Sequence, residues 1–146
     1  MITEFKDENR FLSNFSPCTV EYAGLSFRSV EHAFVAAKTE DRGEQAHVQT
    51  LTAGQAKRFG RNLNLRPSWD LMKIEVMRGL LEQKFELPEY KKLLIATGSQ
   101  QIVEGNTWGD TFWGMVFNKD GELGEGNNNL GLILMEIREN LVENNA

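Results

Sequence analysis

Apolar residues recur at helical spacing through most of the chain, and this pattern predicts a series of helices separated by short breaks. The apolar stripe in residues 30–37 predicts a helix from about Val30 to Thr39, with Ser29 as its N-cap. The longest pattern covers residues 66–85 and predicts the helix at the centre of the core. Further helices are predicted over residues 43–51, after a break at Gly43, and over 52–60, 87–98 and 129–143.

A few short stretches have strand character instead, because β-branched and aromatic residues are frequent in them. Strands are predicted, in chain order, over residues 2–5, over two stretches of 18–27 that turn at Ala23-Gly24, and over 100–106 and 111–117, which pair with each other. Residues 7–17 and the Gly- and Asn-rich residues 118–129 are predicted to be loops. Since no repeat or linker interrupts this series, we predict a single domain over residues 1–146.

The composition agrees with this picture. Hydrophobic residues make up 40% of the chain and charged residues 25%, which is ordinary for a globular protein. With 146 residues, the chain has the size of one domain with one core. It contains no apolar run near the roughly 20 residues that span a bilayer, and its first residues lack the pattern of a signal peptide. We therefore expect a cytoplasmic protein that has no membrane partner.

Charge and residue types argue against several classes of function. The formal charge of −5 argues against broad, non-specific attraction to nucleic acid. The single cysteine, Cys18, excludes an internal disulfide, and His32 and His47 do not have the spacing of metal ligands. A metal-dependent nuclease would need a tight acidic cluster, which the acidic residues of the chain do not form. We expect neither a metal nor a cofactor.

Glu31 is the first candidate for chemistry. It would be the second residue of the helix after Ser29, beside the unpaired N–H groups and the positive end of the helix dipole. It lies off the apolar stripe and shares a side of the helix with Val35 and Lys38. Glu31 is therefore either a functional carboxylate or a first-turn acid that stabilises the helix, and His32 is either catalytic or a capping and packing residue.

A short basic helix is the second candidate. Its N-terminus has the spacing of a capping box, at Thr52 and Gln55. Lys57, Arg58 and Arg61 follow without an acidic residue between them. These cations either bind a phosphate or form an ordinary solvated helix face.

Carboxylates and tryptophans alternate in the Gly-rich stretch from Ile102 to Gly114. Trp108 and Trp113 are either stacking platforms for a planar ring or core residues. Asp110, between them, could hold ribose hydroxyls or stabilise positive charge on a sugar carbon, and Glu104 supplies a second carboxylate.

Glycines and asparagines precede the last helix, in residues 124–131. Their N–H groups and amide side chains suit a phosphate or a sugar hydroxyl at a helix N-terminus. The alternative is an ordinary turn capped by Asn128 or Asn129.

Five of these segments, in this order, resemble the NADAR family, which includes YbiA-like N-glycosidases. They are FLSNFSP, SVEHAFVAAK, AKRFGR…RPSWD…K…VM…L…KF, TG…IVEGNTWGDTFWG and GEGNNNLGLILMEIR. The resemblance covers nearly the whole chain. Its most specific parts are an E-(five)-D-x-x-W-G pattern that begins at Glu104 and a G-x-G-x-N-x-L-G pattern from Gly124 to Gly131.

The resemblance implies a mainly helical α+β domain with a few short strands, which cleaves N-glycosidic bonds of ribose phosphates or ADP-ribose conjugates. The implied substrates are phosphoribosylamino-pyrimidine intermediates of riboflavin biosynthesis, or guanine that carries ADP-ribose, free or within nucleic acid. After Trp113-Gly114 the chain departs from the YbiA-like W-G-D-G pattern and inserts a longer, hairpin-like stretch. The resemblance therefore supports the broader class rather than the riboflavin intermediate.

Positive charge builds up on the ribose ring when a C1′–N bond breaks, so the site needs carboxylates near C1′. We expect Glu31 and Asp110 to be the catalytic pair. The expected substrate-binding residues are Ser13, Asn14, Lys57, Arg61, Glu104, Trp113 and Asn128. The alternative is a non-catalytic module that binds ADP-ribose or another nucleotide. Carboxylates facing a negatively charged ligand favour the enzyme, and no obligate protein partner is expected.

Overall fold

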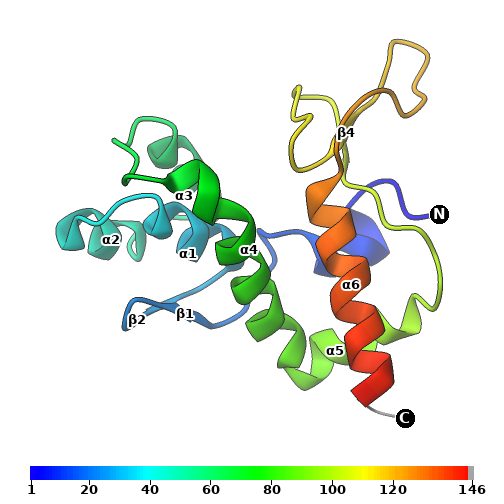
Figure 1. The fold of residues 1–146 in the computed structure, drawn as a ribbon, viewed down its shortest axis with the longest axis horizontal. Helices are drawn as coiled ribbons and strands as arrows, with labels where there is room; N and C mark the ends of the chain where they lie inside the picture. The colour runs from blue at the N-terminus through cyan, green and yellow to red at the C-terminus, as the bar shows by residue number, and fades with distance from the viewer. Residues whose placement is uncertain (145–146) are drawn as a thin grey trace. The chain divides into compact units, whose positions relative to one another are not determined.

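The computed structural model describes residues 1–144, and these form two compact units. Unit 1 consists of Met1–Ser13 and the described residues from Leu87 onward, and unit 2 is Asn14–Glu86. Helices predominate in both units, and the strands of the described residues are all short (Figure 1). The prediction of a mainly helical α+β fold is confirmed. Within residues 1–144, no helix combines the length and the apolar character that crossing a membrane requires.

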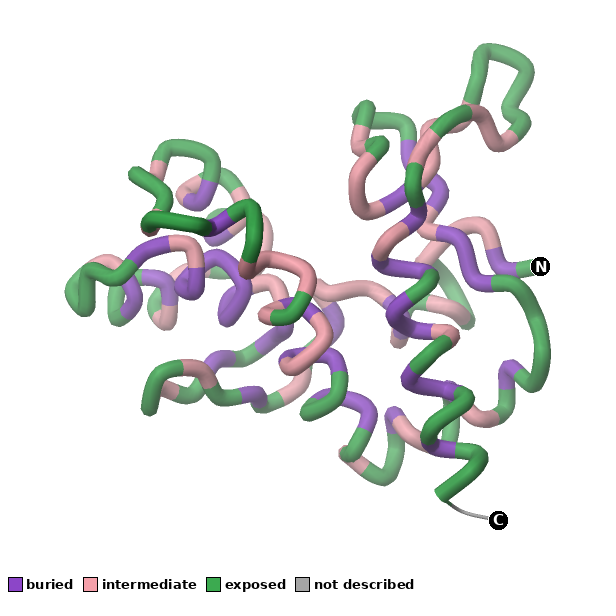
Figure 2. Tube along the Cα trace, in the orientation of Figure 1, coloured by how far each residue is buried: buried purple, intermediate pink, exposed green. Residues whose placement is uncertain are grey.

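Unit 2 is built around α1 (Val30–Ala37). All residues of this helix except Glu31 are buried (Figure 2). It contacts α2 (Arg42–Val48), α3 (Ala53–Gly60) and α4 (Trp69–Glu86). The prediction that the longest helix, α4, lies at the centre of the core is therefore wrong for this unit. Small alanine side chains let neighbouring elements approach α1 from several directions, whereas α4 has one exposed face.

The N-caps of α1 and α3 are those that the sequence predicts. Ser29 precedes α1, and its hydroxyl accepts a hydrogen bond from the His32 N–H at 3.2 Å. Thr52 and Gln55 form a complete capping box at the start of α3. These signals are local, because each cap satisfies N–H groups only three residues away.

The break predicted at Gly43 is wrong. Asp41 caps α2, and its carboxylate accepts from the Glu44 N–H at 2.8 Å. This cap starts the helix before Gly43, which therefore lies in the first turn. A glycine in a first turn costs little, since the cap supplies the stabilisation there.

Unit 2 also contains a β-hairpin. β1 (Val20–Tyr22) pairs antiparallel with β2 (Leu25–Phe27), as predicted. The turn between them has φ of 52° at Ala23 and 82° at Gly24, the left-handed pair that suits a two-residue hairpin loop.

Unit 1 contains α5 (Pro88–Ala96) and α6 (Asn129–Asn144), which pack against each other. Both helices were predicted, and α5 has its proline in the first turn. Two short strands, β3 (Gly105–Asn106) and β4 (Met115–Val116), pair in parallel and confirm the predicted pairing of their segments. Parallel pairing of such short strands depends on the loops around them.

Two predictions for the N-terminal segment are wrong. Residues 2–5 do not form a strand, and only Ile2 makes an isolated parallel bridge, to Ile102. The predicted loop over residues 7–17 contains a 3₁₀-helix, η1 (Asp7–Leu12). Its single buried residue, Leu12, and its contact with α5 hold it in place, and the sequence pattern alone does not show that contact.

Candidate functional site

The residues that were predicted to form the site are divided between the two units. Unit 1 contains Ser13, Glu104, Asp110, Trp113 and Asn128. Unit 2 contains Asn14, Glu31, Lys57 and Arg61. Glu31 and Asp110 belong to different units, so their pairing as a catalytic couple stays a prediction.

Glu31 lies in the first turn of α1 and is half-buried. Its backbone N–H has no acceptor within the helix and donates instead to the carbonyl of Asn14, at 3.0 Å. This bond joins α1 to the predicted substrate-binding segment. The Glu31 carboxylate therefore belongs to the positive end of a helix, and the Glu31 backbone is bonded to that of Asn14.

His32 has a structural role. It is buried, and its Nδ1 lies 2.6 Å from the Ser29 hydroxyl while its Nε2 lies 2.8 Å from the Leu51 carbonyl. Because a carbonyl can only accept, Nε2 carries the proton and Nδ1 accepts from Ser29. The capping and packing alternative is the one that the structure shows.

Cationic side chains at or near α1, α3 and α4 lie within electrostatic range of one another around Lys38. Burial lowers the pKa of Lys38, and the nearby Glu31 carboxylate acts in the opposite direction. Three further cations also lower this pKa, and they are Lys57, Arg61 and Lys73. The predicted phosphate ligands of α3 therefore lie within electrostatic range of Lys38, which in turn feels the charge of Glu31.

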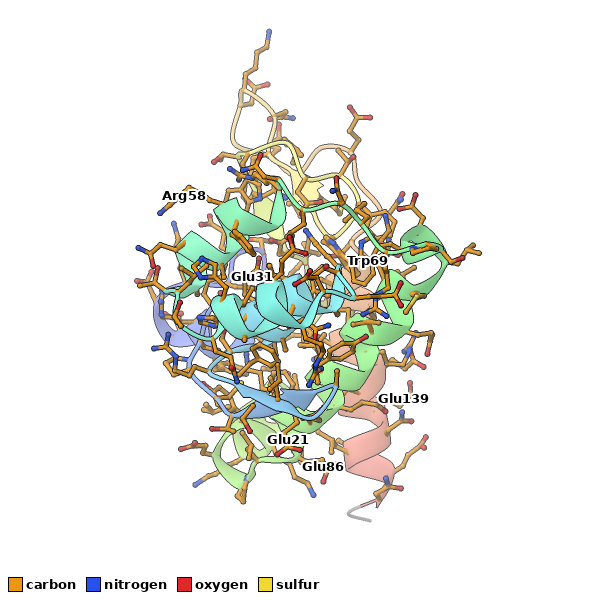
Figure 3. All side chains as sticks on the ribbon, turned by 90° about the vertical axis from the view of Figure 1, so that its left-hand side faces the viewer. Glu21, Glu31, Arg58, Trp69, Glu86 and Glu139 are labelled. Carbon is orange, nitrogen blue, oxygen red and sulfur yellow. The ribbon has the colours of Figure 1, made fainter. Side chains whose placement is uncertain are left out.

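Two of these cations lie near aromatic rings, and a third forms an ion pair with an acidic residue. Lys38 Nζ lies 5.8 Å from the centroid of Phe34, and Lys57 Nζ lies 5.7 Å from that of Phe15. Lys73 forms an exposed ion pair with Asp70 at 3.1 Å. Figure 3 shows the three contributing helices together, with labels on Glu31 of α1, Arg58 of α3 and Trp69 of α4.

Sequence reasoning did not select Lys38 or Lys73 as site residues. Lys38 was expected to share a side of its helix with Glu31, and this spacing was the available signal. Lys73 lies on another helix, and only the packing of α1 against α4 brings it close.

In unit 1, Asp110 organises the loop that carries Trp113. Its Oδ1 accepts hydrogen bonds from the backbone N–H groups of Phe112 and Trp113, at 3.0 and 2.9 Å. The Asp110 backbone is bonded on both sides to the buried side chain of Asn106, at 3.0 and 2.9 Å. This pattern is typical of an Asx turn. Asn106 is a part of the site architecture that sequence reasoning missed.

Glu104 packs closely against Gly114, near the side chain of Asn106. A Cβ atom at Gly114 would collide with the carbonyl and the carboxylate of Glu104, and would lie 2.8 Å from Asn106 Nδ2. Only glycine therefore fits here. The structure thus gathers Glu104 and Asp110 around one buried asparagine.

The side-chain amide of Asn128 is hydrogen-bonded to the backbone of the same region. It is buried with φ of 51°, its Oδ1 accepts from the Glu104 N–H at 3.0 Å, and its Nδ2 donates to the Ile102 carbonyl at 3.0 Å. These two bonds fix the orientation of the Asn128 amide, which keeps a second N–H and a second lone pair. Its predicted binding role stays a prediction.

The remaining predicted residues of unit 1 are partly accessible. The half-buried ring of Trp113 packs edge-to-face against Phe112, with centroids 4.8 Å apart, while Trp108 is 61% exposed. Ser13 is half-buried and follows η1, where its N–H donates to the Arg10 carbonyl at 2.9 Å. In the described part of the chain, no group of three or more His, Cys, Asp or Glu residues is placed to hold a metal ion.

Comparison with known proteins gives concordant matches. A family model described as "NADAR domain" matches residues 2–142. N-glycosidase YbiA of Shigella boydii serotype 4 (strain Sb227) is 37% identical over 139 residues, which are 92% of this chain and 83% of that protein. N-glycosidase Npun_R5314 of Nostoc punctiforme is 33% identical over 136 residues, with coverage of 88% and 83%.

Two further matches extend these findings. Riboflavin biosynthesis protein VVA0006 of Vibrio vulnificus (strain YJ016) is 37% identical over 142 residues, which are 94% of this chain and 37% of that protein. The NMR structure of the E. coli protein YbiA matches with a TM-score of 0.81 and 32% identity, and covers 99% of this chain and 84% of that chain.

Proposed function

The chain belongs to the NADAR family, and from this premise we propose that it hydrolyses the C1′–N bond between a phosphorylated ribose and a base. Relatives that it matches over 83% of their length are N-glycosidases, and the chain is accordingly a hydrolase of N-glycosyl bonds. What we propose beyond this class is the substrate, an ADP-ribosyl guanine or a related ADP-ribosyl or phosphoribosylamino-pyrimidine conjugate. N-glycosidase relatives favour catalysis over a non-catalytic nucleotide reader.

The observation that carries the proposal is a half-buried carboxylate at a helix N-terminus, with several cations in its neighbourhood. Glu31 is the one residue of α1 that is not buried, so it is the part of this central helix that can meet a ligand. Bond cleavage places positive charge on the ribose ring, and Glu31 would stabilise that charge or activate water. Its helix N-terminus favours the negative charge that either role needs.

The cations explain how a phosphorylated substrate would bind beside this acid. Lys57 and Arg61 would grip phosphate through charge-assisted hydrogen bonds, and Lys38 and Lys73 add positive charge in the same neighbourhood. Their number exceeds what one phosphate group requires. Among the proposed substrates, the diphosphate of an ADP-ribosyl conjugate therefore fits this group better than a single phosphate does.

The residues of unit 1 would act on the sugar and the base. Asp110 would orient ribose hydroxyls or water through Oδ2, since Oδ1 already accepts two backbone hydrogen bonds. The ring of Trp113 would stack on the base or the edge of the sugar. Glu104 and Ser13 would line the sugar site, and Asn128 would hold a second phosphate or a hydroxyl.

A substrate panel tests the proposal. Purified protein is incubated with an ADP-ribosylated guanine oligonucleotide and, separately, with a phosphoribosylamino-pyrimidine, and release of ADP-ribose or ribose phosphate is followed. Glu31→Gln should lower kcat by roughly 10²- to 10⁴-fold with a small change in KM. Glu21→Gln is the matched control, because this exposed glutamate of β1 bonds through its backbone to Gln83. Full activity of Glu31→Gln would refute the role of Glu31, and no release from either substrate would refute the substrate class.

A further inference from the structure

Lys84 is a fully buried lysine of α4 that the proposed reaction does not yet use. It continues the buried side of the helix formed by Met77, Leu80 and Leu81. Its Nζ donates to the hydroxyl of Ser16 at 2.7 Å and lies 5.1 Å from the ring centroid of Phe85. A lysine in such a place needs a specific reason, because burying an ammonium group is costly.

The partner of Lys84 belongs to the segment that carries Asn14. This segment, residues 14–18, is held against α4 at two places. Asn14 Nδ2 contacts Met77 Sδ at 3.6 Å, and Ser16 binds Lys84 two helical turns further along α4. At its start, the carbonyl of Asn14 accepts the hydrogen bond from Glu31.

We infer that Lys84 is a positioning residue for the proposed reaction: its bond to Ser16 holds residues 14–18 where Asn14 meets the N-terminus of α1. This inference rests on the proposed role of Glu31 in substrate hydrolysis and on the predicted role of Asn14 in substrate binding. Without the bond, the segment loses its contact with Lys84 but keeps that of Asn14 with Met77 and the bond from the Cys18 N–H to the Arg28 carbonyl at 3.1 Å, so the change falls mainly on the part around Asn14 and Ser16. Asn14 then shifts relative to Glu31, although neither residue has been changed.

The protonation state of Lys84 gives this anchor a pH dependence. Burial lowers the pKa of Lys84 to about 7, and the negative charge of the Cys18 thiolate form, in the same segment, acts in the opposite direction. Above this pH the neutral amine still donates to Ser16. Below it the buried ammonium group is far from the hydration that its charge favours, and this cost acts against the bond to Ser16. Turnover should therefore fall as the pH drops through about 7.

Two variants test the anchor. Lys84→Met keeps the unbranched stem of the side chain and removes the terminal donor, and Ser16→Ala removes the acceptor. Each should lower kcat/KM on the better substrate by about tenfold, as expected for one hydrogen bond of average strength, and the double variant should lose no more than either single one. Lys84→Met should also lack the decline of kcat near pH 7, which a merely structural role would not remove. Lys92→Met, on the exposed face of α5, is the control.

Amide hydrogen exchange gives a readout that does not depend on turnover. The Glu31 N–H has no intrahelical acceptor, so its protection reports whether Asn14 is in place. It should exchange faster in Lys84→Met and Ser16→Ala than in the wild type or Ser16→Thr, which keeps the hydroxyl, while later amides of α1 stay unchanged. Unchanged exchange at Glu31 in folded variants would overturn the inference. If the wild type hydrolysed neither substrate, the proposed function would fail, and this exchange experiment would still decide whether Lys84 positions the segment.

Discussion

The negative charge of Asp110 and its capacity to accept hydrogen bonds have different roles, one in the proposed chemistry and one in the structure of the loop. Oδ1 accepts from the backbone N–H groups of Phe112 and Trp113, and an amide oxygen could accept the same two bonds. The proposed chemistry requires the negative charge, whereas the loop requires only an acceptor. Substitution by asparagine and by alanine therefore separates the two roles.

Asp110→Asn should fold with nearly wild-type stability and lose at least about tenfold in kcat, because the turn remains and the charge is removed. Asp110→Ala should also lose about 1–3 kcal/mol of unfolding free energy, since two backbone donors are left without their acceptor. Urea unfolding and steady-state kinetics on the same preparations provide the measurements. Wild-type turnover in Asp110→Asn would reduce Asp110 to a structural residue.

Lys84 should also affect the pH dependence of stability. Its pKa is about 7 in the folded protein, below the ordinary value of 10.5, so the unfolded chain binds more protons between these two values. Unfolding free energy therefore rises with pH in this range, by at most about 1.4 kcal/mol per pH unit from this residue. Below pH 7 the full penalty for the buried charge is present.

Urea unfolding at pH 7 and at pH 8.5 measures this effect. The wild type should gain stability between the two pH values, relative to Lys84→Met, which lacks the titrating group. Equal changes in the two proteins would mean that Lys84 keeps its charge when the protein is folded.

At the level of elements, helix caps and the hairpin turn could be predicted from the sequence, because residues close together in the chain determine them. The caps at Ser29 and Thr52 and the hairpin turn at Ala23-Gly24 each involve groups only a few residues apart. The 3₁₀-helix at Asp7–Leu12 and the bridge of Ile2 depend instead on segments distant in sequence. No local pattern contains that information.

The same distinction applies to the candidate site, where some residues have a local signal in the sequence and others have none. Glu31 could be found because a carboxylate after an N-cap serine is a local signal. Asn106 could not, because its importance lies in bonds to both sides of Asp110 that only the folded loop creates. Lys84 had a usable signal, since it is a lysine within the apolar stripe of α4, where a charged residue is unexpected.

A pair of glycines tests the packing of these elements. Gly131 lies in α6, and a Cβ there would collide with the Ile102 carbonyl and lie 2.5 Å from both amide atoms of Asn128. Gly131→Ala should cost about 1–3 kcal/mol of unfolding free energy, since backbone cannot move aside easily. Gly79 lies in α4, where a Cβ would meet no atom of another element within 4 Å, so Gly79→Ala should gain about 0.5–1 kcal/mol. Chemical denaturation compares the two, and a neutral Gly131→Ala would contradict the close approach.

At the level of the whole molecule, unit 1 is assembled from both ends of the chain. Its two segments are joined by backbone hydrogen bonds from Ile2 to Gln101, from Val103 to Ile2 and from Gly105 to Thr3, at 2.8, 2.8 and 2.9 Å. Bringing these segments together while unit 2 is unfolded would close a long flexible loop, at a cost in entropy. A folded unit 2 removes most of that cost, because it fixes the ends from which both segments leave.

The prediction of one domain stays a prediction, and it requires that the two units unfold together. Trp69→Phe leaves Trp108 and Trp113 as fluorescent probes of unit 1, while the single cysteine, Cys18, reports on unit 2 through pulsed thiol labelling. Trp69 itself lies in unit 2, so the stability cost of Trp69→Phe reaches the unit 1 probes only if the two units unfold together. The fluorescence and labelling midpoints in urea should coincide, as a cooperative two-state transition requires. Loss of unit 1 structure at a lower urea concentration, with Cys18 still protected, would mean that unit 2 folds by itself as a separate domain.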